Sequence, residues 1–216
     1  MDFNCELYCF IVNNGSGSKV IKIAKENGID GVTALIGKGT ISSKLLNALG
    51  ISEERKELIL MAAEQSIGDK ALDIIHDKMH MDKPNKGISF SLPIMKTYGS
   101  RLERYKNIKE EELKMGYYLI ITIVERGNDD QVIDAASSAG SRGGTVLNGR
   151  GSGIHETKKL FNIEIEPEKE LVLILAKSDV TEQIVAAIRK ELEIDEPGKG
   201  IIFILDVNKT YGLFEG

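Results

Sequence analysis

The stretch Tyr117-Tyr118-Leu119-Ile120-Ile121-Thr122-Ile123-Val124 is apolar and rich in β-branched residues. Such a run predicts a strand with both faces buried. Asp129 and Asp130 then open a predicted helix that stops at Gly140, because acidic residues stabilise a first helical turn and glycine commonly ends a helix. A second strand is expected over 144–147. The stretch therefore begins a β-α-β unit.

A second unit follows a glycine-rich polar segment, 149–167, which we expect to be a long loop. A continuous apolar run predicts a strand over 171–176, and helical spacing of apolar residues predicts a helix over 180–192. A turn at 195–198 leads to a fourth strand over 201–207. The order β-α-β-β-α-β predicts an α+β, ferredoxin-like module, with an antiparallel four-stranded sheet and both helices on one face.

The first half of the chain repeats this module. Three groups recur in order, 112, 113 and 113 positions apart: Gly37-Lys38-Gly39 as Gly149-Arg150-Gly151, Lys86-Gly87-Ile88 as Lys199-Gly200-Ile201, and Lys96-Thr97-Tyr98-Gly99 as Lys209-Thr210-Tyr211-Gly212. The conserved order predicts two tandem copies of one module. We place module 1 at 1–99, a charged linker at 100–115 and module 2 at 116–216.

Module 1 is expected to have the same elements in the same order. These are strands over 7–12, 32–36, 58–62 and 88–92, helices over 18–26 and 69–80, and a loop over 37–56. The strands of both copies are apolar on both sides. Helices cover one face of each sheet, so the other face is expected to stack against the second copy or against another chain.

Composition limits the classes of partner. The chain has 216 residues, 42% of them hydrophobic and 28% charged, and a net charge of −5, which argues against nucleic acid as a partner. A local basic pocket for a small anion is compatible with this charge. The sequence shows neither a transmembrane segment nor a signal peptide, and its two cysteines, Cys5 and Cys9, fit buried thiols in a reducing compartment. We therefore expect a cytoplasmic protein.

Two glycine-basic clusters in module 2 are the candidate binding residues. Gly149-Arg150-Gly151-Ser152-Gly153 follows the second strand, and Gly198-Lys199-Gly200 precedes the fourth. Glycines allow a ligand close to the backbone, successive N–H groups can hold an anion, and arginine or lysine adds a cation. Their counterparts in module 1 are Gly37-Lys38-Gly39 and Lys86-Gly87. The alternative is a loop and a tight turn that bind nothing.

The histidines carry a second alternative. His76 and His80 are four residues apart on a predicted helix, a spacing that can hold a divalent metal, although the pattern supplies no third ligand. His155 lies in the long loop. No set of nucleophile, base and orienting residue can be assembled, so we expect a protein that is not an enzyme.

Module 2 resembles the PII-type nitrogen-regulatory signalling family. The resemblance rests on the element order, on Gly149-Arg150-Gly151 at the root of the long loop, on Gly198-Lys199-Gly200 before the fourth strand, and on Phe203-Ile204-Leu205-Asp206-Val207 at its end. It covers most of 116–216 and is fainter over 4–99. Ile201 and Glu170 stand where the family has lysines that contact phosphate and oxoglutarate.

The resemblance implies a signalling protein without a required cofactor. Family members are trimers that bind adenine nucleotides between subunits, and they regulate enzymes or transporters through the long loop. Members often bind 2-oxoglutarate as well. For this chain the resemblance implies a homotrimer whose effector is an ATP, ADP or AMP-type nucleotide, and a regulated enzyme or transporter as partner. The alternative is a trimeric structural or divalent-metal-responsive protein of the same fold that binds no nucleotide.

Overall fold

The computed structural model describes residues 5–40, 53–99, 116–152, 158–160, 163–165 and 167–210. Module 1 is built from β1 (Cys5–Asn13), α1 (Gly17–Glu26), β2 (Val32–Thr40), β3 (Glu53–Glu64), α3 (Gln65–Met79) and β4 (Ile88–Pro93), followed by a short β5 (Lys96–Tyr98). Module 2 is built from β6 (Tyr117–Glu125), α4 (Asp129–Ser138), β7 (Thr145–Ser152), β10 (Glu168–Lys177), α5 (Ser178–Glu191) and β11 (Ile201–Val207). The α+β fold with two tandem β-α-β-β-α-β modules is confirmed; the charged linker proposed at 100–115 lies outside the described residues.

The four strands of each module form an antiparallel sheet, and the two sheets are joined edge to edge. The resulting nine-stranded order is β4-β1-β3-β2-β7-β10-β6-β11-β5. The joint is an antiparallel pairing of β2 with β7, in which Val32 lies opposite Ser152 and Leu35 opposite Gly149. The sequence did not predict this pairing.

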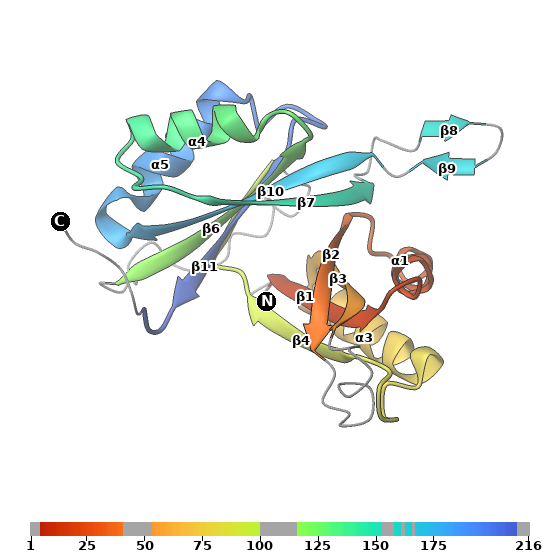
Figure 1. Cartoon of the computed structure of the whole chain (residues 1–216). Coiled ribbons are helices and arrows are strands. Elements are labelled where there is room, and N and C mark those ends of the chain that lie inside the picture. Colours follow the sequence, from red (N-terminus) through yellow and green to blue (C-terminus); the bar gives the residue numbers. More distant parts are fainter. Residues whose placement is uncertain are drawn as a thin grey trace.

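Each module has its own core between its helices and the adjacent face of its sheet. Tyr8, Phe10 and Ile59 belong to the core under α1 and α3, whereas Ile120 and Ile174 belong to the core under α4 and α5. All five side chains are fully buried. The two helix pairs lie on opposite outer sides of the molecule (Figure 1).

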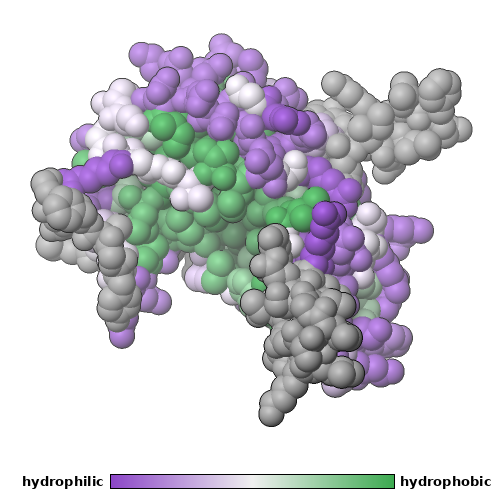
Figure 2. Space-filling model, viewed as in Figure 1, coloured by the Kyte–Doolittle hydropathy of each residue, from purple (hydrophilic) through white to green (hydrophobic). Residues whose placement is uncertain are grey.

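A third core joins the modules. It contains Leu7, Cys9 and Leu35 from module 1 together with Ile121, Phe203 and others from module 2, all from the sheet faces that point away from the helices. The prediction that these faces would be covered by the second copy is confirmed within one chain. Figure 2 shows apolar surface in the middle of the face that is drawn. In the same view, Figure 1 shows that the strands of module 2 cross there.

Strand β5 belongs to the sheet of module 2, although it follows module 1 in the chain. Ile94 N–H donates to Cys5 O at 3.0 Å, and the next residue, Met95, donates to Ile204 O at 2.9 Å. The chain thus leaves the edge of one module and joins the edge of the other within two residues.

The two long loops are shorter than the sequence predicts. Residues 37–40 continue β2, residues 53–56 already belong to β3, and residues 149–152 continue β7. A small hairpin, β8 (Lys158–Leu160) and β9 (Ile163–Ile165), lies within the segment predicted as loop. Glycine-rich polar sequence is a weak strand signal, and these strand ends form through ladder pairing with β3, β10 and β2.

Candidate effector site

The first candidate cluster lies in a strand, which corrects the prediction of a loop. A Cβ on Gly149 would lie 2.5 Å from Leu35 Cδ2, and a Cβ on Gly151 would lie 2.7 Å from Val32 O. The two glycines therefore allow β7 to approach β2 closely. Gly151 N–H donates to Pro167 O at 3.0 Å, so this donor is used inside the fold. The described part of the cluster, 149–152, forms a ladder instead of an anion nest, and Gly153 lies outside the described residues.

Arg150 connects the two modules. Its guanidinium Nη2 lies 3.2 Å from Oε1 of Glu57 on β3, and the side chains are 40% and 6% exposed. The other carboxylate oxygen, Oε2, accepts the N–H of Gly17 at 2.5 Å, at the first turn of α1. A buried carboxylate needs such donors because burial removes it from water. Glu57 therefore fixes the start of α1 and the position of Arg150 together.

Module 2 has an equivalent buried glutamate. Glu170, 113 positions after Glu57, accepts the N–H groups of Gly127 and Asp129 at 2.9 and 3.2 Å with its Oε2. Both glutamates are buried, and both hold the start of the first helix of their module. In the sequence, Glu170 is recognisable only as a departure from the PII-type family. Its recurrence at the repeat spacing was the available signal for a structural role.

The second candidate cluster is a tight turn between α5 and β11. Gly198 has a φ of +86°, and a Cβ on Gly200 would lie 2.8 Å from Ile123 O, so other residues fit poorly at both positions. Lys199 Nζ lies 2.9 Å from Glu193 Oε2. Hydrogen bonding to Glu193 and its negative charge raise the pKa of Lys199. The lysine is therefore paired, and an anion at this turn would compete with Glu193.

The two clusters of module 2 lie at the same end of its sheet. Gly149 is opposite Lys169 of β10, and Lys169 is opposite Glu125 of β6; β11 follows β6. Two strands therefore separate the clusters, which corresponds to about 14 Å across the sheet. The clusters flank this sheet end but do not touch within one module.

The counterparts in module 1 are arranged similarly. Gly37, Lys38 and Gly39 lie in β2, opposite Lys56, Arg55 and Glu54 of β3. Lys86 and Gly87 lie in the turn before β4, where a Cβ on Gly87 would meet Ile11 O at 2.6 Å. The repeated glycines before β4 and β11 thus share one packing role, close approach to the first strand of the module.

The metal alternative finds no assembled ligand set. Helix α3 ends at Met79, and His80 adopts a left-handed φ of 55°, so His76 and His80 do not share a helix face as predicted. Within the described residues no three histidine, cysteine, aspartate or glutamate side chains gather to hold a metal. His155 lies outside them. Likewise, no described helix has the length and apolar character needed to cross a membrane.

Comparison with known proteins identifies the type of module 2. Residues 117–214 match the family described as nitrogen regulatory protein P-II. The match spans slightly less than half of the chain and confirms the resemblance inferred for module 2, as a divergent relative; module 1 lies outside it. No curated protein matches the chain.

Several solved structures are similar in part. Arabidopsis thaliana PII bound to citrate is 28% identical over 44% of this chain and 77% of its own, with a TM-score of 0.34. The regulatory subunit of aspartate kinase from Thermus thermophilus, in its ligand-free form, is 12% identical over 88% of this chain and 93% of its own, with a TM-score of 0.37. The small subunit of acetolactate synthase from Thermotoga maritima is 13% identical over 95% and 99%, with a TM-score of 0.31.

Proposed function

We propose that the chain is a PII-like signalling protein, not an enzyme, that senses a small anionic effector, an adenine nucleotide of the ATP, ADP or AMP type. The observation that carries the proposal is the match of residues 117–214 to a family of regulatory proteins. That match includes both glycine-basic clusters, which flank one end of the sheet of module 2. The effector site is proposed at this end, with Arg150 and Lys199 as its cations.

Carboxylates near these cations set the expected affinity. Lys199 pairs with Glu193 and Arg150 with Glu57. An anion must displace a carboxylate from each cation that it uses, which offsets part of the binding free energy. Ile201 supplies no charge where the resembling family has a phosphate lysine. The proposed preference is therefore for a weakly bound or less charged nucleotide.

The Arg150–Glu57 pair supplies a path for the signal. Arg150 lies on β7, directly before the residues that lead to the β8–β9 hairpin, and Glu57 fixes α1 of the other module. An anion that draws Arg150 away from Glu57 changes the junction of the two modules and the root of this hairpin together. The regulated enzyme or transporter is proposed to recognise the hairpin region, in a homotrimer of the chain.

Isothermal calorimetry of the full chain tests the proposal. ATP, ADP, AMP and cyclic nucleotides are titrated with and without 2-oxoglutarate, beside a divalent-metal titration as the competing alternative. The matched pair of variants is Lys199→Ala and Lys190→Ala, since Lys190 is an exposed lysine on α5 away from the turn. Binding that weakens only in Lys199→Ala supports the site. Absence of binding by every nucleotide at millimolar concentration overturns the function, and binding unchanged by Lys199→Ala overturns the placement.

A further inference from the structure

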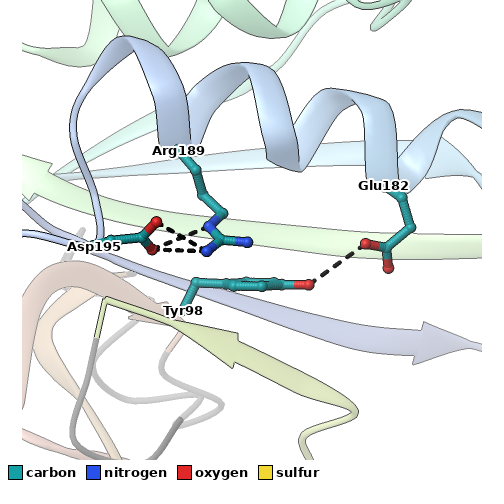
Figure 3. Close-up of polar contacts among 4 residues, drawn as sticks. All are labelled: Tyr98, Glu182, Arg189 and Asp195. Atoms are coloured by element: carbon teal, nitrogen blue, oxygen red, sulfur yellow. Dashed lines mark hydrogen bonds and ion pairs between the residues drawn. The ribbon is translucent and has the colours of Figure 1, made fainter. Parts of the chain in front are cut away.

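Strand β5 is held on module 2 by a small set of side chains. It pairs with β11 in an antiparallel register, with Tyr98 opposite Ile202 and Lys96 opposite Ile204. The guanidinium carbon of Arg189 lies 4.2 Å from the centroid of the Tyr98 ring, and the hydroxyl of Tyr98 donates to Glu182 Oε2 at 3.4 Å. Lys96 Nζ lies 2.7 Å from Glu182 Oε1. Figure 3 shows the Tyr98 ring next to Arg189, with its hydroxyl directed at Glu182; both partners lie on α5.

Glu182, Arg189 and Asp195 form a socket for Tyr98. Arg189 is held in place by Asp195. Its guanidinium donates to both oxygens of Asp195, at 2.9 Å each, and these bonds hold it over the ring (Figure 3). A cation over an aromatic face favours this position of Tyr98. Burial raises the pKa of Tyr98, in agreement with a shielded phenol.

Module 1 has residues of related chemistry at the equivalent positions, at the repeat spacing of 113. Asp69, His76 and Asp82 correspond to Glu182, Arg189 and Asp195. The surrounding backbone corresponds as well: α3 and α5 occupy equivalent positions, and His80 and Glu193 after them have left-handed φ values of 55° and 51°. The repeat therefore puts an imidazole and two carboxylates at the positions that Arg189, Glu182 and Asp195 have beside β11; in module 1, Asp69 Oδ1 accepts the hydroxyl of Tyr8 at 2.7 Å.

The edge of β4 lacks the strand that covers β11. Within the described part of the chain, β4 pairs with β1 alone and ends the sheet. Ile88, Phe90 and Leu92 are 59%, 41% and 37% exposed, whereas Phe203 and Leu205, the equivalents of Phe90 and Leu92 in β11, are buried in the core that joins the modules. An apolar edge strand with open backbone groups is a template for another strand.

The chain contains a second copy of the segment that fits this edge. Lys209-Thr210-Tyr211-Gly212 is identical to Lys96-Thr97-Tyr98-Gly99, and it follows β11 as β5 follows β4. Lys209 and Thr210 lie outside any strand of their own chain. The segment repeats the residues of β5 that the socket of module 2 holds, and its described residues, 209 and 210, are not paired with β4 of their own chain.

We propose that Lys209–Tyr211 of one copy of this chain adds as a strand to the edge of β4 in a second copy. The register of β5 on β11, moved by the repeat spacing, places Tyr211 opposite Ser89, Thr210 opposite Phe90 and Lys209 opposite Ser91. Tyr211 then lies beside His76, and Lys209 pairs with the carboxylate of Asp69, whose Oδ1 already accepts the hydroxyl of Tyr8 at 2.7 Å. The contact does not involve the proposed effector site. Its test can therefore fail without contradicting the proposed function, and the reverse also holds.

Engineered cysteines test the contact directly. A chain carrying Ser89→Cys is mixed with a chain carrying Tyr211→Cys under mild oxidation, and a third chain carries both changes. The matched control replaces Ser89→Cys with Ser18→Cys, an exposed serine on α1. The native Cys5 and Cys9 interfere little because both are buried, and burial raises the pKa of Cys9 to about 11.

The expected result is a disulfide-linked pair of chains in the mixture of Ser89→Cys with Tyr211→Cys, and none with Ser18→Cys. An intramolecular disulfide at the mass of one chain in the double variant would show that the segment folds back on its own β4 and would overturn the proposal. The absence of any cross-link would also overturn the proposal.

A second measurement needs no new cysteine. Amides of β4 should exchange at least tenfold faster in a chain that ends at Val207, and unchanged exchange contradicts the proposal.

Discussion

Glu57 of module 1 and Arg150 of module 2 form an ion pair across the joint of the two sheets, with Oε1 and Nη2 3.2 Å apart. The carboxylate is buried and also caps α1 through Gly17. This pair ties the fold of one module to the position of the other. The repeated glycines beside Arg150 serve the same joint, because they allow β7 to approach β2.

Removing the carboxylate should cost more than removing the cation. Glu57→Ala removes a carboxylate that accepts from the N–H of Gly17 and pairs with Arg150, and should lower the free energy of unfolding by about 2–3 kcal/mol. Arg150→Ala should cost about 1 kcal/mol, since Arg150 is 40% exposed and water can replace part of its bond. Urea unfolding followed by circular dichroism measures both. Glu26→Ala, which breaks an exposed pair with Lys22, is the control and should change stability by less than about 0.5 kcal/mol.

Valine at Gly149 should separate the two sheets at their joint. The added Cβ would lie 2.5 Å from Leu35 Cδ2 and 2.9 Å from Ala34 O, and backbone cannot move aside cheaply. We expect a loss of about 1–3 kcal/mol, as for overpacking, together with faster amide exchange in β2. Gly37→Val is the matched control, because a Cβ there meets nothing within 4 Å. Equal losses in the two variants would contradict the packing role of Gly149.

The fold was predictable because its signals are local or repeated. Apolar runs such as 117–124 and the recurring Lys-Thr-Tyr-Gly groups are visible in the chain and define both modules. The bounds of β11, 201–207, agree with the structure. The strand character of 149–152 was not predictable, since those residues become a strand only through partners that are distant in sequence.

The candidate site was predicted less well for the same reason. The sequence shows which basic residues are adjacent to glycines, but not which carboxylates form ion pairs with them. Glu57 pairs with Arg150 at a separation of 93 residues, and β5 leaves module 1 to join β11. Such contacts depend on how the two modules pack. The sequence indicates a structural role only where the same residue recurs at the repeat spacing, as Glu57 and Glu170 do.

Stability should fall on the alkaline side as Cys9 titrates. Burial raises the pKa of the Cys9 thiol to about 11 from the ordinary 9.0. The unfolded chain therefore releases this proton first as pH rises, so the free energy of unfolding decreases with pH between about 9 and 11 and is unaffected by this group below that window. The loss should reach about 2 kcal/mol.

Cys9→Val provides the control for that titration. Valine has a similar volume and no proton to release, so the variant should lose this part of the alkaline slope. Burial and the hydrogen bond to Asp69 also raise the pKa of Tyr8, and this part of the slope remains at higher pH in both chains. Urea unfolding at pH 8, 9, 10 and 11 makes the comparison. Parallel curves for the two chains would show that Cys9 does not titrate in this way.

The Lys199–Glu193 pair predicts opposite effects on anion binding from its two members. Lys199→Ala removes a charge-assisted contact and should weaken binding of a nucleotide by about 1–3 kcal/mol. Glu193→Gln keeps the size of the side chain but removes the charge that lies 2.9 Å from Nζ, so the freed lysine should bind the same nucleotide more tightly. Calorimetry on the single variants and on the double variant measures the coupling. Glu193→Gln should have no effect when Lys199 is already alanine; tighter binding in that background would show that Glu193 repels the effector without acting through Lys199, and weaker binding in Glu193→Gln alone would remove Lys199 from the proposed site.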